Sequence, residues 1–566
     1  MEEFCAAVWQ AIPAFKRTLP AIINMWKNED ASMNFGADYR IPLLIGVTGH
    51  RDLLPADRDG IAERVRAFFT LLKAEFPHTP LRVYSAFAAG ADQLVAEVAL
   101  ASGLDVVGVL PMPEAAYVGD FADDPDALAR FQRLLEGREV IVLDLEPQTL
   151  DDRTLKDRYA VLTNFLAVRC QLLLALWDGC ESPEIGGTAF TVVSKLHGRL
   201  DADAALIDPI EAGLVYHIPI RRELAPNSQP KPRDGFLATT EIAPYLEALR
   251  EIDNYNAVPP QSVSNESTVE RAFLHADRLA LKMQGRVRRS RFAVFGCLST
   301  LVLAYAIYSE YGQLIVALAV YLGALIAGAA IWSAARGANL ERRFLDYRTL
   351  AEALRIQAMW TRSGLNSSVA DYYLRKHRHE LRWIRFALRG FSSNDAVIAL
   401  LTQRRMAPVR MRFAIDEGII RAWMVDQRAY YSNSANVRER RLANLQRCAA
   451  ALYGLGIAAA IAAIGREFWN ELGMVQHAIV LLMGVLPALA GMIGAWIKQV
   501  ALAEEAARAR AMESLFAHAL QEWDHPQNAA VRASIAEDLG KEALHENADW
   551  LALRRERPIE APLGSG

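Results

Sequence analysis

The chain has 566 residues, of which 52% are apolar and 23% are charged, and its net charge is −4. This length exceeds one ordinary hydrophobic core, so several structural units are expected, and the near-neutral charge excludes a mainly electrostatic nucleic-acid partner. The five cysteines are scattered without a CxxC pair or metal-ligand spacing, so the sequence predicts neither a disulfide framework nor a metal site.

Residues 1–39 form an N-terminal extension with an apolar helical pattern and none of the features of a signal peptide. From residue 40 to residue 220, short apolar β-like runs alternate with helical stretches. This alternation predicts an α/β domain with a parallel sheet and helices on both faces. The strand candidates are Leu43–Thr48, Leu81–Phe87, Val106–Leu110, Val140–Leu145, Gln171–Trp177 and Leu214–Ile218.

Three loops of this domain combine glycine with polar residues directly after a predicted strand. Residues 48–51 follow the first strand, residues 85–92 follow the second, and residues 178–188 follow the fifth. The second and third loops lead into predicted helices at Gln93–Ala101 and Ala189–His197. Since ligands of such sheets bind at the carboxyl ends of the strands, we expect the functional site at these loops.

The residue types in these loops suit an anionic ligand. Glycine lets the backbone approach a ligand, and a helix N-terminus offers unpaired N–H groups and a positive dipole end. Arginine adds charge-assisted bonds to phosphate. Helix capping is the alternative role for Asp92 and Thr188, and a structural role is the alternative for His50. The candidate ligand-binding residues are Gly49, His50, Arg51, Ser85, Gly90, Asp92, Arg158, Asp178, Gly186, Gly187 and Thr188; no catalytic residue is identified.

Residues 221–268 are rich in Pro, Ser and Asn and are interpreted as a linker that contains one helix, Glu241–Asn256. Beyond the linker, four stretches contain no charged residue. About 20 apolar residues in a helix cross a hydrocarbon core of ~30 Å, so these stretches predict four transmembrane helices; buried helices of a soluble protein are the alternative. The stretches are Phe292–Tyr308, Leu314–Ala335, Cys448–Ile464 and Ala478–Ile497.

Lys and Arg gather before the first and after the second stretch of each pair, while the connecting loops are poor in them. By the positive-inside rule, both loops face outward and both termini are cytoplasmic, which predicts a multi-pass protein of the cell inner (plasma) membrane. The absence of ionisable residues from the stretches argues against a proton relay. Their many Gly and Ala residues predict close helix packing, either within one chain or in a homo-oligomer.

Each pair of apolar stretches is followed by an amphipathic helical pattern, at Leu340–Ala358 and at Gln499–Trp523, which predicts an internal duplication. The first two-span module covers residues 269–390 and the second covers residues 448–524. Between the two pairs of apolar stretches, cytosolic helices are expected at Asp371–Leu388 and Ala414–Tyr431. Residues 391–447 are the connecting segment, and a tail occupies residues 525–566.

Several motifs of the N-terminal half resemble those of SLOG domains. They are Gly-Val-Thr-Gly-His-Arg at 46–51, Ser-Ala-Phe-Ala-Ala-Gly-Ala-Asp at 85–92, Leu-Pro at 110–111, Trp-Asp-Gly at 177–179 and Gly-Gly-Thr at 186–188. The C-terminal half resembles the two-span SLATT domains. Its clearest stretch is Tyr347–Arg355, and Trp423 with Asp426-Gln427 belongs to a weaker second copy.

The resemblance implies a Rossmann-like domain that senses a nucleotide or nucleotide-derived signal without a further cofactor. It also implies a membrane effector that forms pores or perturbs the bilayer in bacterial conflict or antiphage defence. A membrane-tethered hydrolase of the phosphoribohydrolase type is the alternative, and a scaffold with a vestigial pocket is a third. Phosphoribohydrolases follow their glycine motif with a catalytic Glu, whereas residues 189–192 here are Ala-Phe-Thr-Val, which favours binding over hydrolysis.

Overall fold

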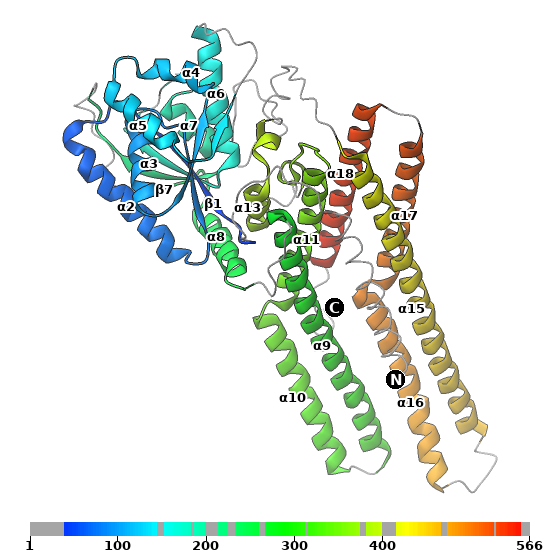
Figure 1. Cartoon of the computed structure of the whole chain (residues 1–566). Helices are drawn as coiled ribbons and strands as arrows, with labels where there is room; N and C mark the ends of the chain where they lie inside the picture. The colour runs from blue at the N-terminus through cyan, green and yellow to red at the C-terminus, as the bar shows by residue number, and fades with distance from the viewer. Residues whose placement is uncertain are drawn as a thin grey trace.

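The structure is a computed structural model in which an α/β domain lies beside a set of long helices (Figure 1). Of the N-terminal extension predicted for residues 1–39, only Tyr39 lies within the described part. The described residues are 39–143, 152–180, 182, 186–198, 212–223, 233–259, 267–311, 314–373, 381–398, 415–465, 473–525 and 528–555.

The α/β domain contains a seven-stranded sheet in the order β4-β3-β2-β1-β5-β6-β7. All neighbouring strands are parallel except β6 and β7, which are antiparallel. The expected wholly parallel sheet is therefore wrong at one edge, because β7 lies inside the range assigned to the linker. The strands are β1 (Leu43–Gly49), β2 (Leu81–Ser85), β3 (Asp105–Leu110), β4 (Val140–Val142), β5 (Leu172–Trp177), β6 (Leu214–Pro219) and β7 (Gly235–Leu237).

The central strands form where the sequence is continuously apolar, because helices cover both faces of the sheet and leave no strand face in water. Every residue of β5 is buried. On one face Phe68 and Phe69 pack into the core, and on the other Phe165 and Leu166 do so. The covering helices are η1 (Pro55–Asp57), α2 (Arg58–Glu75), α3 (Ala91–Ala101), α4 (Glu114–Tyr117), η2 (Val118–Phe121), α5 (Pro125–Leu135), α6 (Asp152–Arg169), α7 (Thr188–His197) and α8 (Ala243–Asn256).

The C-terminal part is helical, and four of its helices are long and apolar enough to cross a membrane. In their apolar windows at most 11% of residues are buried, so a large apolar surface has no protein cover. Two of these helices extend far beyond the predicted spans toward the α/β domain (Figure 1). The four helices are α9 (Thr268–Glu310), α10 (Ile315–Gly337), α15 (Glu417–Gly465) and α16 (Gly473–Val500).

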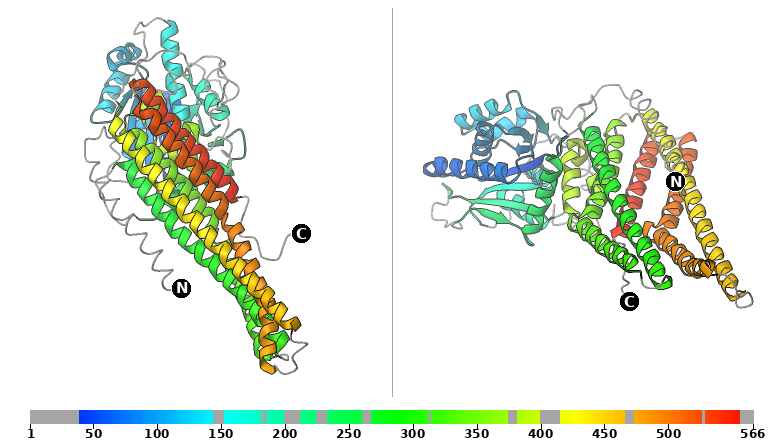
Figure 2. Two further views of the ribbon diagram at one scale, coloured as in Figure 1. Left: turned by 90° about the vertical axis from the view of Figure 1, so that its right-hand side faces the viewer. Right: turned by 90° about the horizontal axis from the view of Figure 1, so that it is seen from below.

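These four helices contact one another in the order α10, α9, α16, α15 (Figures 1 and 2). A Cβ on Gly328 of α10 would lie 3.3 Å from Cβ of Cys297 on α9. The ring of Phe292 on α9 stacks on Trp496 of α16, with centroids 4.7 Å apart. The helices therefore form two hairpins that meet through α9 and α16.

Each hairpin is followed by a helix that begins at a left-handed residue. Asn339, with φ +48°, separates α10 from α11 (Leu340–Arg362), and Ala501, with φ +51°, separates α16 from α17 (Leu502–Asp524). The N–H of Asn339 and the N–H of Ala501 each donate to the carbonyl three residues earlier, both at 3.0 Å. Helix α11 packs on α9 as α17 packs on α15, so the duplicated arrangement that the sequence predicts is present.

Two ranges differ from expectation. The single helix predicted for residues 371–388 is interrupted: α12 (Val369–Tyr372) ends at an extended Tyr373, and α13 (Arg382–Phe391) follows separately. The tail predicted for residues 525–566 contains helix α18 (Ala529–Arg555), which packs on α11.

The amino-terminal edge of the sheet rests on the helical part. Arg169, at the end of α6, donates to the Asn394 side chain at 3.0 Å and to the carbonyl of Arg389. Gln171, just before β5, donates to the carbonyl of Phe386 on α13 at 2.9 Å. The opposite, carboxyl edge of the sheet therefore lies away from this contact.

We expect Gly540→Ala to loosen α18. A Cβ there would lie 2.7 Å from the buried ring of Trp360, so the ring or the helix must shift, at a cost of about 1–3 kcal/mol. Faster hydrogen exchange across residues 529–555 and a lower melting temperature in detergent would show this. Gly285→Ala is the matched control, because it also adds a methyl group within a helix but meets nothing within 4 Å. It should be neutral or stabilising; equal behaviour of the two variants would contradict the prediction.

Candidate ligand site at the carboxyl edge of the sheet

The three predicted loops converge at one edge of the sheet. The N–H of His50, after β1, donates to the carbonyl of Leu176 in β5 at 3.2 Å. The N–H of Ala91, at the start of α3, donates to the carbonyl of His50 at 3.1 Å. Main-chain hydrogen bonds therefore join the loop after β1 to the end of β5 and to the start of α3, which follows the loop after β2.

The glycines of the first two loops are needed for contact between the loops themselves. Gly90 has φ +82°, and a Cβ on it would lie 2.2 Å from the carbonyl oxygen of Arg51. A Cβ on Gly49 would lie 2.3 Å from Cβ of Ala91. The sequence pattern predicts that these glycines let a ligand approach, but protein atoms occupy the space beside them.

The third loop joins the others through Tyr159 of α6. Gly186 has φ +86°, and a Cβ on it would lie 2.6 Å from Cβ of Tyr159. Gly187 is the N-cap of α7 and makes no side-chain cap bond. Thr188 is the first helical residue and is only half-buried. Thr188 is therefore not the cap of α7.

Arg51 lies at the centre of a polar cluster. Its guanidinium pairs with Asp120 at 2.8 Å and lies 5.7 Å from the centroid of the Tyr159 ring. The Tyr159 hydroxyl donates to Asp120, which completes the triangle. The Arg51 side chain is 48% exposed, so it can still reach a ligand. Sequence reasoning missed Asp120 and Tyr159, because neither belongs to a loop that directly follows a strand.

Asp92 lies in the first turn of α3 and is 6% exposed. Gly90, not Asp92, is the N-cap, so the capping interpretation is wrong here. Burial raises the pKa of Asp92 to about 7, although the nearby Arg51 and a hydrogen bond from the main chain of Ala86 act in the opposite direction. The hydroxyl of Ser85 donates to the carbonyl of Asp92 at 3.2 Å, so Ser85 shapes this loop.

A second polar cluster surrounds Asp178, after β5. Nε2 of His50 lies 3.2 Å and Nη1 of Arg222 lies 3.7 Å from its two carboxylate oxygens. Burial alone would raise the pKa of Asp178, but the N–H of Cys180, His50 and Arg222 hold it below its usual value. Burial lowers the pKa of His50 by more than Asp178 raises it, which favours a neutral imidazole. Arg222 also binds Asp52 at 3.0 Å.

Sequence reasoning missed Arg222, because residues 221–268 were assigned to a linker. Arg158, which it did propose, lies in α6 but is only 3% exposed, so its charge faces the interior. Of the proposed residues, the structure thus brings His50 and Asp178 into one cluster and Arg51 into another. Within the described ranges, no group of three or more His, Cys, Asp or Glu residues could hold a metal ion.

An open groove of about 780 Å³ lies next to these clusters, between α2 and the end of β6. Two ion pairs line it, Arg64 with Asp234 and Arg221 with Asp57. The exposed Arg233 also contributes to its wall. The groove therefore extends the polar edge of the sheet toward β7, and no local sequence pattern indicates it.

No protein-family model, no curated protein and no solved structure matches this chain. The resemblance to SLOG and SLATT domains therefore stays a prediction, and the functional interpretation rests on the geometry described above.

We expect Gly90→Ala to destabilise the chain by on the order of 3 kcal/mol, because the new methyl group would overlap the Arg51 carbonyl at a left-handed backbone position. Gly103→Ala is the control, since Gly103 has φ +68° but nothing within 4 Å of its Cβ position. It should cost only about 1 kcal/mol, the left-handed penalty alone. Urea unfolding of both variants measures the difference; equal costs would show that the contact between the loops is unimportant.

We also expect Asp92 to make stability depend on pH. A carboxyl whose pKa rises from 3.8 to about 7 on folding stabilises the fold below pH 4 and loses that contribution as the pH rises through 7. Between pH 4 and pH 7 the unfolding free energy should fall by up to about 1.4 kcal/mol per unit relative to Asp92→Asn.

Urea unfolding at several pH values, followed by tryptophan fluorescence, measures this difference. Asp123→Asn removes an exposed carboxylate of the same domain and should keep the slope of the original chain. A slope unchanged by Asp92→Asn would mean that Asp92 is ionised in the fold throughout this range.

Proposed function

We propose that this chain is a membrane effector whose Rossmann-like domain binds a nucleotide-derived phosphorylated ligand and thereby controls the membrane helices. The observation that carries the proposal is the convergence of three loops, with Arg51, His50 and an uncapped helix N-terminus, at the sheet edge opposite the helical part. The motifs that resemble SLOG and SLATT domains point to the same pair of roles.

Phosphate is the ligand chemistry that this edge suits best. Arginine and helix N-termini bind phosphate through charge-assisted bonds and oriented N–H groups. Arg51 is half-exposed beside the start of α7, and Tyr159 links the two. The groove lined by Arg64, Arg221 and Arg233 could accommodate a further part of the ligand, such as a ribose or a second phosphate.

Insertion into the inner membrane is supported by the apolar surface of α9, α10, α15 and α16. Ile315 on α10 is 80% exposed and Ile464 on α15 is 71% exposed, which is costly in water but favourable in lipid. Glu310 pairs with His477 at 2.7 Å near the far ends of both hairpins, and the arginine-rich ends lie toward the α/β domain. This polarity favours cytoplasmic termini.

Helix α6 offers a physical route between the ligand site and the helical part. Tyr159 in α6 contacts Arg51 at the site. At the end of the same helix, Arg169 donates to Asn394, which follows α13, and to the carbonyl of Arg389 in the last turn of α13. On α13, the indole of Trp383 donates to Asp346 of α11 at 3.2 Å. A ligand that separates Tyr159 from Arg51 would displace α6. It would shift the membrane helices only if it binds one of two arrangements of the chain more tightly than the other.

Pore formation or bilayer perturbation by a homo-oligomer, in bacterial conflict or antiphage defence, is the output that we propose. The apolar segments hold no ionisable side chain, which is unlike an ion-coupled carrier. Gly323 of α10 and Gly484, Gly491 and Gly494 of α16 have no atom of the described residues within 4 Å of their Cβ positions. Such positions could contact a second copy closely.

A membrane-tethered nucleotide hydrolase is the second candidate, and Asp92 favours it. A carboxyl group with a pKa of about 7 is suited to act as a general acid or base near neutral pH. Asp92 is buried beneath the loops, however, and residues 189–192 lack the carboxylate of the phosphoribohydrolases. Ligand binding therefore remains our main proposal.

For the full chain in dye-filled liposomes, we expect one member of a panel of nucleoside phosphates, dinucleotides and ADP-ribose to change the release rate. Arg51→Ala should raise the required ligand concentration about 10- to 100-fold, the effect of losing one charge-assisted bond. Gly187→Asp should abolish the response by placing a negative charge at the α7 N-terminus. Arg169→Met should preserve binding, measured by thermal shift, but weaken release.

Arg66→Ala is the matched control, because it removes an exposed arginine of the same domain far along α2. Its response should equal that of the original chain. Release that is indifferent to every ligand and every substitution would contradict the gating proposal. If mass spectrometry instead finds ligand turnover that Asp92→Asn abolishes, the hydrolase is the better description.

A further inference from the structure

The first hairpin carries a group of arginines where its helices leave the apolar region on the side of the α/β domain. All six are exposed. We call them the first collar: Arg286, Arg288 and Arg289 of α9, Arg336 of α10, and Arg342 and Arg343 of α11.

Helix packing gathers these arginines at one level. Cys297 of α9 faces Gly328 of α10, and because the two helices are antiparallel, Arg289 lies at the level of Arg336. Arg291 of α9 pairs with Glu341 of α11, which brings the first turn of α11 to the same level. The first collar is therefore continuous across three helices.

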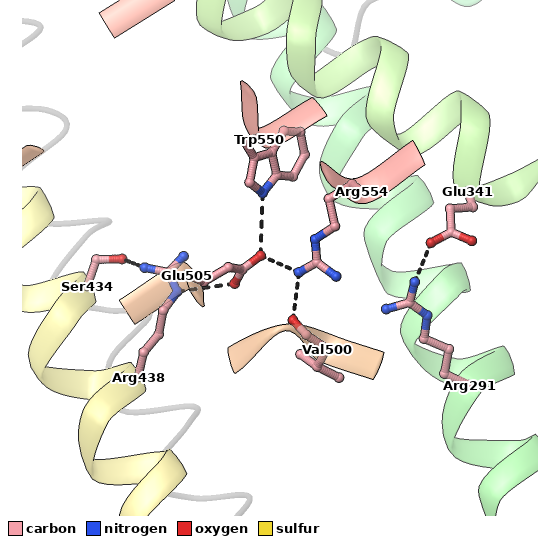
Figure 3. Close-up of polar contacts among 8 residues, drawn as sticks. All are labelled: Arg291, Glu341, Ser434, Arg438, Val500, Glu505, Trp550 and Arg554. Carbon is pink, nitrogen blue, oxygen red and sulfur yellow. Dashed lines mark hydrogen bonds and ion pairs between the residues drawn. The ribbon is translucent and has the colours of Figure 1, made fainter. Parts of the chain in front are cut away.

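Two acidic residues at this level, Glu341 and Glu505, are largely buried and already paired (Figure 3). Arg291 and Glu341 are only 11% and 17% exposed. In the second hairpin, Glu505 of α17 binds Arg554, Arg438 and the indole of Trp550. Glu341 and Glu505 are therefore paired with arginines outside the first collar.

Among the collar residues, Arg342 has the nearest acidic group, Asp346, at 3.9 Å. That carboxylate is already bound by Arg555 at 2.9 Å and by Trp383 at 3.2 Å. Arg336 lies 5.3 Å from the centroid of the Trp332 ring, an aromatic residue one turn toward the apolar region. Tryptophan favours the headgroup level of a bilayer, so this pair fits the boundary between lipid and water.

The second hairpin provides a comparison within the same chain. When Asn339 is matched to Ala501, Arg336 corresponds to Lys498, but Arg342 and Arg343 correspond to Glu504 and Glu505. The two copies thus share their backbone geometry and differ in charge. The start of α11 is therefore positive where the start of α17 is negative.

We infer that the first collar binds the phosphate-bearing headgroups of anionic phospholipids in the cytoplasmic leaflet. The inference rests on the membrane insertion proposed above. Guanidinium groups bind phosphodiester oxygens through paired hydrogen bonds, and basic clusters directly beside membrane helices recruit anionic lipids. The collar surrounds the break between α10 and α11, so the lipid is held where the membrane helix joins the cytosolic helix.

The test uses the full chain in nanodiscs of phosphatidylcholine with a minor fraction of phosphatidylglycerol. After release from the nanodisc, native mass spectrometry counts the lipids that stay bound. We expect phosphatidylglycerol to be enriched over its share of the disc, and we expect the triple variant Arg336→Gln, Arg342→Gln, Arg343→Gln to lower that enrichment about tenfold. The same three positions changed to Lys should retain most of it.

The control variant, Arg66→Gln, Arg133→Gln, Arg250→Gln, removes three exposed arginines of the α/β domain and should leave the enrichment unchanged. Equal enrichment in the collar variant and the original chain would overturn the inference. Loss of bound phosphatidylglycerol upon addition of millimolar inorganic phosphate would also overturn it, because the site would then bind free phosphate.

Two failures are distinguishable in this experiment. A chain that does not enter the nanodisc at all would overturn both the membrane effector and the collar. A chain that enters, responds to nucleotide in the dye-release assay and binds both lipids without preference would overturn the collar alone. Circular dichroism of each variant confirms that its helices are intact.

Discussion

The docking of Arg169 determines how the two halves of this protein can work together. Arg169 is fully buried, lies 5.7 Å from the centroid of the Tyr84 ring, and donates to Asn394 and to the carbonyl of Arg389. A buried guanidinium is costly unless it is bonded, so these partners hold the amino edge of the sheet on the helical part. The carboxyl edge consequently faces away from the helices.

At the open edge, polar side chains pair with one another. Arg51 binds Asp120, and Asp178 binds His50 and Arg222. Under the proposed function, a ligand would replace some of these contacts and so change the position of α6. Gly49 and Gly90 have a different role: because they lack side chains, the loops after β1 and β2 can contact each other.

In the helical part, each hairpin is followed by the same left-handed turn, at Asn339 and at Ala501, but the charges beside the two turns differ. The first copy presents Arg342 and Arg343 where the second has Glu504 and Glu505. The two copies thus share their backbone geometry and differ in their electrostatic surroundings.

Local sequence patterns are sufficient to predict the elements whose cause is local. Continuous apolar runs indicate β1 and β5, charge-free stretches indicate the four long apolar helices, and the amphipathic pattern after each hairpin indicates α11 and α17. The strand order then explains why the three glycine loops meet. Three features could be found only in the folded chain: the place of Asp120, Tyr159 and Arg222 in the candidate site, the addition of β7 to the sheet, and the packing of α18 as a helix. These depend on contacts between residues far apart in the chain, for which local patterns hold no signal.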